Sequence, residues 1–276
     1  MFLCWPCRFH RQNHLRRRIT TAAMVDEWNL EKSFAFYKDR FADAGDFTFV
    51  FVGSFDIATM KPLVERYLGG LPSTGRKETW KDVGARLPTG VIEKTVEKGI
   101  EPRSQTAMIF NGPFEYDPMH RTTMRAMTQI LQMRLLETIR EELGGTYSIS
   151  VSPGLQKIPN PEYQIAIQFG SDPARVNDLA KRVLDEIEKF KAKGPTEKQV
   201  ADEISAIVRE FETSSKTNNF LLGQIAGKYQ YGEDVAGVWD APELSKKLDA
   251  ASIQEAAKTY FAMKNFVKVT LLPEKK

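Results

Sequence analysis

A long amphipathic helix in the middle of the chain constrains its fold more than any other feature. From about His120 to Leu143, large apolar residues recur at helical spacing: Met124, Met127, Leu131, Leu135 and Ile139. Methionines in such a stripe usually fill a hydrophobic core, so they do not indicate a cofactor site. The pair Gly144-Gly145 ends the helix, and a strand is expected immediately after it. The sequence therefore predicts a helix-to-strand corner at about 144–147.

Strands are predicted in pairs on both sides of this helix. Two precede it, "GVIEKTVEKG" at 90–99 and "SQTAMIFNG" at 104–112. Two follow it, at about 146–152 and 162–170, and the second alternates apolar and polar residues. The segment "FVKVTLLP" is predicted as a last strand near the C-terminus.

Helices dominate the region between the fourth strand and the last one. Asp172-Pro173 is an N-cap followed by a proline at the first helical position, and Gly194 ends the helix that starts there. Thr196 and Gln199 have capping-box spacing and start the next helix, and helical segments continue to about Ala262. Clustered strands and segregated helices favour an α+β fold, with helices packed on a mostly antiparallel sheet, over a doubly wound parallel sheet.

The N-terminal third is predicted to hold two helices and a strand. "NLEKSFAFYKDRF" places Leu30, Phe34, Tyr37 and Phe41 on one helical face, with Asn29 as the N-cap. "DFTFVFVGSFD" is dense in Phe and Val and is interpreted as a buried strand. Asp56 is expected to cap the helix "IATMKPLVERYLGGLP", and residues 69–90 to form a surface connection.

The composition is that of a globular protein and excludes two function classes. No apolar run approaches the ~20 residues that a membrane-spanning helix needs. The net charge is +3, but residues 1–25 hold five arginines and no acidic residue, so the remaining residues carry 34 basic and 36 acidic groups. The nearly equal numbers of basic and acidic residues after residue 25 give no support for nucleic-acid binding, which requires a basic face.

Residues 1–24 are expected to be a disordered leader, or the product of a start codon upstream of the true one at Met24. Both cysteines of the chain lie here, and Cys4, Cys7, His10 and His14 superficially offer four zinc ligands. Only two residues separate the two ligand pairs, which leaves nothing to fold around a metal ion. The Arg-rich, acid-free composition loosely suits an organellar transit peptide.

The chain lacks the motifs of a self-sufficient enzyme. The sequence contains no G-x-S-x-G nucleophile elbow, no phosphate-binding loop, no G-x-G-x-x-G and no cysteine beyond residue 7. His120 stands alone at a helix start, where a surface histidine of the first turn is the expected interpretation. By direct chemistry the chain is expected to be a binding or scaffold domain.

Four segments resemble one protein family in order and spacing. They are "FYKDRFADAGDFTFVFVG", "YLGGLPS", "IREELGGTYS" and "KGPTEKQV", which stands before a long helix. Together they resemble the C-terminal half of the zinc-dependent pitrilysin (M16) peptidases, and most closely the large bacterial "zinc protease" type. The resemblance implies the family's LuxS/MPP-like α+β fold over residues 25–276, with about 25–45 forming the tail of the preceding domain.

The resemblance also implies a role for Arg140 and Tyr147. In this family a zinc-bearing half carries an H-x-x-E-H motif, and the C-terminal half supplies an arginine and a tyrosine, seven residues apart, that reach the peptide substrate. Arg140 and Tyr147 match that pair in spacing and context. A guanidinium can hold a substrate carbonyl or carboxylate, and a phenol can donate to a developing oxyanion. Packing alone would also explain each residue, because an arginine suits a helix C-terminus and a tyrosine suits a strand.

The sequence contains no H-x-x-E-H, which by itself does not discriminate between three hypotheses, whereas the presence of Arg140 and Tyr147 favours the first of them. The first is a non-catalytic, substrate-binding domain that holds neither catalytic residues nor zinc and completes a peptide-cleaving chamber with a zinc-bearing half, in the same full-length protein or on a separate subunit. The second is a structural or assembly scaffold of the same fold, and a third is a free-standing peptide binder that uses a sheet edge. The family resemblance favours the bacterial periplasm or envelope, whereas the Arg-rich leader suits an organelle.

Overall fold

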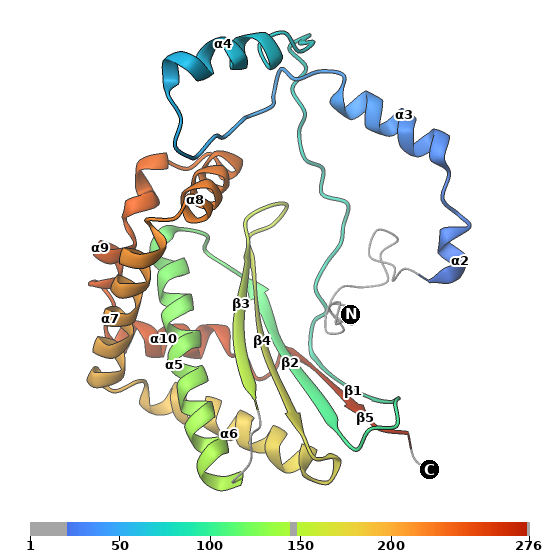
Figure 1. Cartoon of the computed structure of the whole chain (residues 1–276). Coiled ribbons are helices and arrows are strands. Elements are labelled where there is room, and N and C mark those ends of the chain that lie inside the picture. The colour runs from blue at the N-terminus through green and yellow to red at the C-terminus, as the bar shows by residue number, and fades with distance from the viewer. Residues whose placement is uncertain (1–20, 144–147, 275–276) are drawn as a thin grey trace. The chain divides into compact units, whose positions relative to one another are not determined.

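The computed structural model describes residues 21–143 and 148–274 (Figure 1). The chain divides into two units. The larger unit holds Val83–Phe211 and Trp239–Lys276, and the smaller unit holds Arg18–Asp82 and Glu212–Val238. Each unit is described by itself below. The leader with Cys4, Cys7, His10 and His14 lies outside the described residues.

The larger unit is built on a five-stranded sheet in the order β1-β5-β2-β4-β3. The strands are β1 (Val91–Glu97), β2 (Ser104–Pro113), β3 (Ile149–Gln156), β4 (Glu162–Ser171) and β5 (Phe266–Leu272). Only the pair β1–β5 is parallel among these strands, and the other three pairs are antiparallel. The mostly antiparallel sheet predicted from the sequence is confirmed, and β1 and β3 form its two edges.

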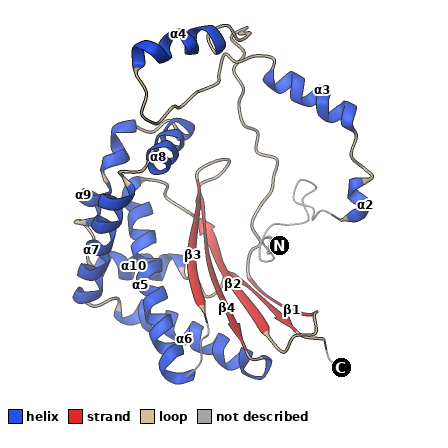
Figure 2. Ribbon diagram, in the orientation of Figure 1, coloured by secondary structure: helices blue, strands red, loops and turns tan. Residues whose placement is uncertain are grey.

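Helices α5 (Pro118–Leu143), α6 (Val176–Lys193) and α10 (Ala250–Tyr260) pack together beside this sheet and contact its strands (Figure 2). The predicted stripe of α5 is fully buried, and it shares one hydrophobic core with Phe110 of β2, Ile167 of β4 and Val151 of β3. Burial of this stripe is the main reason why α5 forms, because each large apolar side chain contributes about 1.5–3 kcal/mol when it leaves water.

Local signals set the boundaries of the other helices in this unit. Asp172 accepts a hydrogen bond from the backbone of Ala174 at the 3₁₀ turn η2 (Pro173–Arg175), which leads into α6. Gly194 ends α6 with a φ of 68°. Thr196 and Gln199 exchange the two hydrogen bonds of the predicted capping box at the start of α7 (Glu197–Ser214). The remaining short elements are η3 (Val235–Trp239) and α9 (Ala241–Ser245).

The smaller unit holds α2 (Ala22–Val25), α3 (Leu30–Phe41), α4 (Ile57–Tyr67) and α8 (Asn218–Tyr231). The predicted caps are confirmed: Asn29 accepts from the backbone N–H of Lys32, and Asp56 accepts from that of Thr59, each over 2.8 Å. The apolar faces of α3 and α4 form as the sequence indicates. No residue of either helix is buried, however.

The strand predicted for "DFTFVFVGSFD" is wrong within the described residues. The segment has no regular secondary structure, and Phe47, Phe49, Phe51 and Phe55 are all exposed. The residue pattern is that of a strand, but a strand forms only when a neighbour accepts its backbone hydrogen bonds. No strand in the described part of the chain pairs with this segment.

None of the helices described here combines the length and the apolar character that crossing a lipid bilayer requires.

Candidate functional site

The predicted site lies at the corner between α5 and β3. Arg140 belongs to the last turn of α5, and β3 begins at Ile149, so the helix-to-strand corner stands where the sequence predicts it. Residues 144–147, including Tyr147, lie outside the described residues, and so does the side chain of Arg140. The convergence of the two side chains therefore stays a prediction.

The last turns of α5 are anchored on two sides. Leu135 and Ile139 are buried in the core. Arg134, on another side of the helix, places its guanidinium 2.7 Å from a carboxylate oxygen of Glu186 on α6 and donates to the carbonyl oxygen of Gly194 over 3.1 Å. A side chain can bind a substrate specifically only if the backbone that carries it is rigid. The buried side chains and the contacts of Arg134 together hold the C-terminal part of α5, which carries Arg140.

A third contact joins α5 directly to the edge strand β3. The side-chain oxygen of Gln132 accepts a hydrogen bond from the backbone N–H of Val151 over 2.9 Å. Because Val151 lies on an edge strand with β4 on its other side, this N–H is one that would otherwise point away from the sheet. Two residues further along β3, Pro153 has no N–H to offer.

Together Gln132 and Pro153 guard the β3 edge against a further strand. In an antiparallel edge strand, alternate residues present their N–H groups outward, so Val151 and Pro153 belong to the same outward set. One of these positions is already hydrogen-bonded and the other has no donor. Natural proteins protect edges in this way against unwanted pairing. The arrangement therefore disfavours the hypothesis of a peptide binder that uses this sheet edge.

A polar hollow of about 210 Å³ adjoins the start of β3 in the larger unit. Among the residues that line it are Ser148 and Ser150 at the beginning of β3, Gln105 on β2, and Gln168 on β4. Ser148 directly follows Tyr147 in the sequence, so this hollow is the described surface next to the predicted corner. Its serine hydroxyls and glutamine amides can donate and accept hydrogen bonds, as a peptide backbone requires.

Glu115, Asp117 and His120 form a cluster at the start of α5, in which a ligand atom of each lies within 4.8 Å of the others. Asp117 accepts hydrogen bonds from the backbone N–H groups of Met119 and His120 and also contacts the His120 ring. Burial alone would raise the pKa of the Asp117 carboxyl, but these hydrogen bonds and the imidazole outweigh it and hold that pKa below its usual value.

This cluster does not fit the catalytic zinc of an M16 peptidase. Its single imidazole has a carboxylate beside each ring nitrogen, since Glu115 lies 3.5 Å from Nε2 and Asp117 contacts Nδ1. The Asp117 carboxylate serves the helix N-terminus, and the inverted motif with its second histidine is missing from the sequence. The cluster is a helix cap of the kind expected for His120.

Glu203 on α7 is a carboxyl group with an altered pKa that the sequence does not reveal. Burial of its side chain, together with the nearby carboxylate of Glu210, raises the pKa of Glu203 to about 7. It belongs to α7, and its raised pKa makes it a determinant of stability.

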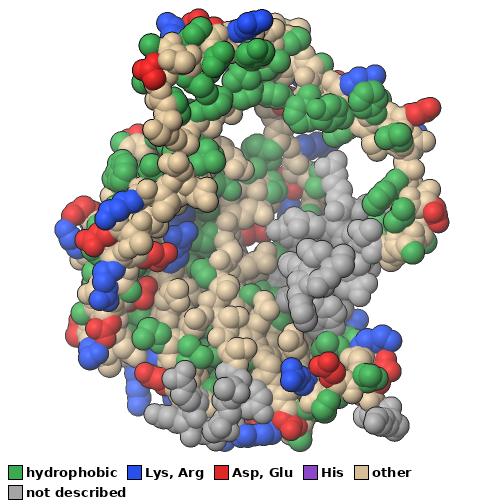
Figure 3. Space-filling view, viewed as in Figure 1, with side chains coloured by type: hydrophobic (Ala, Val, Ile, Leu, Met, Phe, Trp, Pro, Cys, Tyr) green, Lys and Arg blue, Asp and Glu red, His purple; other side chains and the backbone are tan. Residues whose placement is uncertain are grey.

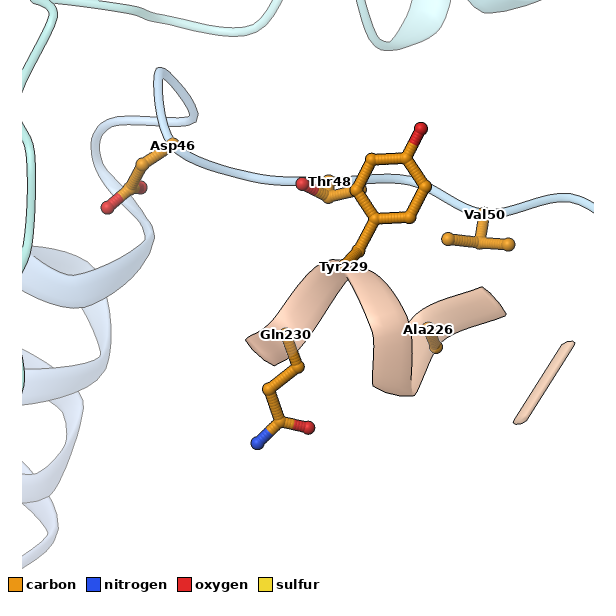
Figure 4. A pocket seen from close by; sticks show the side chains of 6 residues that line it. All are labelled: Asp46, Thr48, Val50, Ala226, Tyr229 and Gln230. Carbon is orange, nitrogen blue, oxygen red and sulfur yellow. The ribbon is translucent and has the colours of Figure 1, made fainter. Parts of the chain in front are cut away.

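A second hollow, of about 350 Å³, lies in the smaller unit. It is lined by Asp46, Thr48 and Val50 from the segment after α3, and by Ala226, Tyr229 and Gln230 of α8 (Figure 4). Its lining lacks a histidine, a cysteine or paired acids, so it carries no catalytic chemistry.

The comparison with known proteins decides the family. The family described as "Peptidase M16 inactive domain" matches residues 27–207, well over half of the chain. The chain belongs to this family. The resemblance of the four segments to the C-terminal part of M16 peptidases is thereby confirmed, and the word "inactive" in the family description agrees with the missing zinc motif.

Two curated relatives of this M16 domain are described as zinc proteases. The probable zinc protease PqqL of Haemophilus influenzae is 26% identical over 182 residues, which is 64% of this chain and 19% of that protein. The zinc protease PQQL-like of Arabidopsis thaliana is 24% identical over 216 residues, covering 72% and 22% respectively. The M16 domain thus spans about a fifth of the length of these relatives.

A solved structure confirms the fold. The crystal structure of the periplasmic protease PqqL from Escherichia coli matches 98% of this chain and 30% of that chain, with a TM-score of 0.81 and 20% identity. The predicted α+β fold of the M16 family is therefore confirmed. The M16 domain corresponds to one part of a considerably longer protein in this relative.

Proposed function

We propose that this M16 domain is the non-catalytic, substrate-binding part of a zinc metallopeptidase. In this account it completes a peptide-cleaving chamber together with a zinc-bearing half that contains H-x-x-E-H. The observation that carries the proposal is the combination of an inactive-domain match with the R-x6-Y pair at the α5–β3 corner. Packing explains either residue alone, whereas the substrate-binding role explains why both stand at this spacing on one corner.

Arg140 and Tyr147 perform the substrate contacts in this proposal. The guanidinium of Arg140 offers planar, two-point hydrogen bonding to a carbonyl or carboxylate of the peptide. The hydroxyl of Tyr147 donates to the carbonyl oxygen that gains negative charge as the peptide bond is attacked. The polar hollow at Ser148 and Gln168 provides hydrogen-bonding groups for the adjoining peptide backbone. Zinc, held by the other half, supplies the Lewis acid that peptide hydrolysis in this family uses.

The experiment that tests this proposal is a reconstitution. The chain and the H-x-x-E-H polypeptide of the same genome are purified separately, and hydrolysis of a fluorogenic peptide library is measured for each alone and for the mixture. We expect hydrolysis only in the mixture, or in a single protein that contains both parts. We also expect metal analysis to find no stoichiometric zinc on the chain itself.

Two results would contradict the proposal. One tightly held zinc per chain, with peptide hydrolysis by the chain alone that a chelator abolishes, would make it a complete enzyme. Full hydrolysis by the zinc-bearing polypeptide without this chain would support the scaffold hypothesis instead.

The proposed location follows the same relatives. The E. coli protein is described as periplasmic, and we propose the periplasm or cell envelope for this chain as well. Fractionation of the native cells with an antibody against the domain tests this, and recovery from an organelle would favour the transit-peptide interpretation of the Arg-rich leader.

A further inference from the structure

The sheet of the larger unit has one face packed against helices and an opposite face that is partly open. Along β4 every second residue is buried, and Ile165, Ile167 and Phe169 belong to the hydrophobic core. The residues between them point to the opposite face, because successive side chains of a strand alternate. Gln168 on β4 and Ser150 on β3 are exposed there. The open face therefore includes β3 and β4.

The open face is uncharged over its middle rows. The register of β2, β4 and β3 gives the residues of this face as Gln105, Ala107, Ile109 and Asn111 on β2, Gln164, Ala166, Gln168 and Gly170 on β4, and Ser150, Ser152 and Gly154 on β3. In Figure 3 the surface over β3 and β4 is largely tan, the colour of neutral polar side chains and backbone. Because charged residues make up 27% of the chain, their absence from these rows is a specific feature of the face.

The polar hollow of about 210 Å³ lies at one end of this open face, and the sizes of the side chains explain why it is there. Gln105 stands opposite Gly170, and Gln168 stands opposite Ala107. Residues opposite each other in neighbouring strands are close enough for their side chains to touch. Here each long amide side chain has a residue with little or no side chain beside it. The two glutamines therefore stand beside an open space rather than packing against a large neighbour.

The polar groups of the hollow have unused hydrogen-bonding capacity. Within the described residues, no side-chain hydrogen bond or ion pair involves its four exposed polar side chains, Gln105, Ser148, Ser150 and Gln168. A glutamine amide offers two N–H donors and a carbonyl acceptor, and a serine hydroxyl can both donate and accept. The hollow can therefore bind a group that itself both donates and accepts hydrogen bonds.

The size and chemistry of the hollow suit one neutral side chain. Clefts that hold whole small-molecule ligands measure about 300–1,000 Å³, which is larger than this hollow. A charged side chain would lose its hydration there, and no lining residue carries a counter-charge. An apolar side chain would cover the amide groups without forming hydrogen bonds to them. A side chain that ends in an amide or a hydroxyl avoids both costs.

We propose that the polar hollow is a specificity pocket for a neutral polar side chain of the peptide substrate, and that Gln105 and Gln168 are the residues that recognise it. Ser148 lines the hollow and directly follows Tyr147 in the sequence, so the pocket adjoins the residue proposed to contact the carbonyl group under attack. The inference rests on the proposed function and adds the chemical class of one substrate side chain to it.

Peptide selectivity of the assembled peptidase tests the pocket. The substrates are fluorogenic peptides that differ at one position, which holds glutamine, glutamate, lysine or leucine, and this position is moved along the peptide. We expect one position at which glutamine gives a kcat/KM about tenfold higher than the other three residues. A difference of this size corresponds to the hydrogen bonds that only the amide can form in the hollow.

Charged replacements of Gln168 should redirect this selectivity. Gln168→Lys places an ammonium group in the hollow, so kcat/KM for the glutamate peptide should rise about fivefold relative to the glutamine peptide. Gln168→Glu should have the same effect for the lysine peptide. Both variants should keep the melting temperature of the parent, because Gln168 is exposed. Gln230→Lys, at an exposed glutamine of α8, is the matched control and should keep the selectivity of the parent.

Binding to the chain alone provides a readout that does not depend on hydrolysis. The side-chain amide signals of Gln105 and Gln168 are followed by NMR in the full chain. The probes are two pentapeptides that are identical except for glutamine or glutamate at the centre. We expect the glutamine peptide to shift both signals, and the glutamate peptide to need about ten times the concentration for the same shift.

The outcomes distinguish this inference from the proposed function. An active peptidase with equal kcat/KM for the four residues at every position overturns the pocket alone, and so does selectivity that Gln168→Lys leaves unchanged. Amide shifts specific to the glutamine peptide, in a chain whose assembled form hydrolyses nothing, support the pocket and contradict the proposed function. Absence of both hydrolysis and amide shifts contradicts both.

Discussion

The side chain of Gln132 determines which backbone groups are available at the β3 edge of the sheet. It reaches from α5 to the backbone of β3 and occupies a donor that a peptide strand would otherwise use. Sequence patterns do not reveal this contact, because it joins residues 19 positions apart on different elements. The caps at Asn29, Asp56 and Thr196 were predictable, since each cap and its partner lie three residues apart.

Replacing Gln132 tests whether it guards the β3 edge. Gln132→Met keeps the length of the side chain and removes the acceptor, so the N–H of Val151 loses its partner. We expect a loss of about 1 kcal/mol in the free energy of unfolding and faster hydrogen exchange at Val151. The control is Gln230→Met on the exposed part of α8. Unchanged exchange at Val151 would mean that the contact does not protect the edge.

Glu203 should make stability depend on pH. The pKa of this carboxyl is 4.5 for an ordinary glutamate and about 7 in the fold. A raised carboxyl pKa means that the folded state holds the proton more tightly. Its contribution is therefore fully present below about pH 4.5 and is lost as the pH rises through 7. Glu203→Gln keeps the neutral form at every pH.

Denaturant titrations of Glu203→Gln and the parent should consequently diverge with pH. We expect equal stability near pH 4 and a gain of about 1 kcal/mol for the variant at pH 8, allowing for the solvent that screens a partly exposed group. Glu212→Gln, an exposed position on the same helix, is the control. A constant difference between Glu203→Gln and the parent from pH 4 to 8 would contradict the raised pKa.

At the scale of whole elements, an ion pair joins α5 to α6 beside the hydrophobic core that the two helices share. Arg134 and Glu186 are 17% and 7% exposed, and the guanidinium also lies 5.1 Å from the ring centroid of Phe190. A buried pair need not add much stability by itself, but removing one partner leaves a charge in an apolar place. The hydrophobic stripes of both helices were predictable from the sequence, whereas this pairing between them was not.

Breaking this pair should destabilise the larger unit strongly. We expect Arg134→Met to lower the free energy of unfolding by about 3 kcal/mol, because the buried Glu186 then keeps only the exposed Lys189, whose ammonium lies 3.6 Å from its carboxylate, as a counter-charge. The double variant Arg134→Met/Glu186→Leu should recover most of that loss. Equal losses in the single and double variants would show that packing of the arginine stem, rather than the orphaned charge, accounts for the effect.

The helices and the paired strands were predicted well, and the strand expected at 46–56 was not. The five strands of the sheet and helices α5 to α7 follow from periodicity and capping signals, because those signals reflect faces that this chain itself covers or caps. Helices α3 and α4 follow from their N-caps and periodicity, although their apolar faces are exposed. The segment at 47–53 has an equally strong strand pattern, yet no strand of the described residues pairs with it. Alternating apolar residues indicate a tendency to form a strand, but a strand forms only where its backbone is hydrogen-bonded to a neighbouring strand.

The molecule as a whole combines a self-sufficient unit with one that has few internal supports. The larger unit has a continuous core between its sheet and its helices. The smaller unit leaves the apolar faces of α3 and α4 exposed. The chain spans about a fifth of the length of the two zinc proteases that it resembles.

Tyr147→Phe in the assembled peptidase tests the central claim most directly. The substitution keeps the ring and removes one hydroxyl. Arg140→Lys keeps the positive charge and removes the planar guanidinium, which can form two hydrogen bonds to one carboxylate or carbonyl group. Tyr229→Phe and Arg125→Lys, exposed positions elsewhere in the chain, are the matched controls. Turnover of a fluorogenic peptide and the melting temperature are measured for every variant.

The account predicts a roughly hundredfold fall in kcat for Tyr147→Phe, about 3 kcal/mol of lost transition-state stabilisation, with the melting temperature unchanged. Arg140→Lys should also lower turnover, and both controls should match the parent. Full turnover by both corner variants, or a fall in melting temperature that accounts for the lost activity of Tyr147→Phe, would contradict the claim and leave Arg140 and Tyr147 as structural residues of a scaffold.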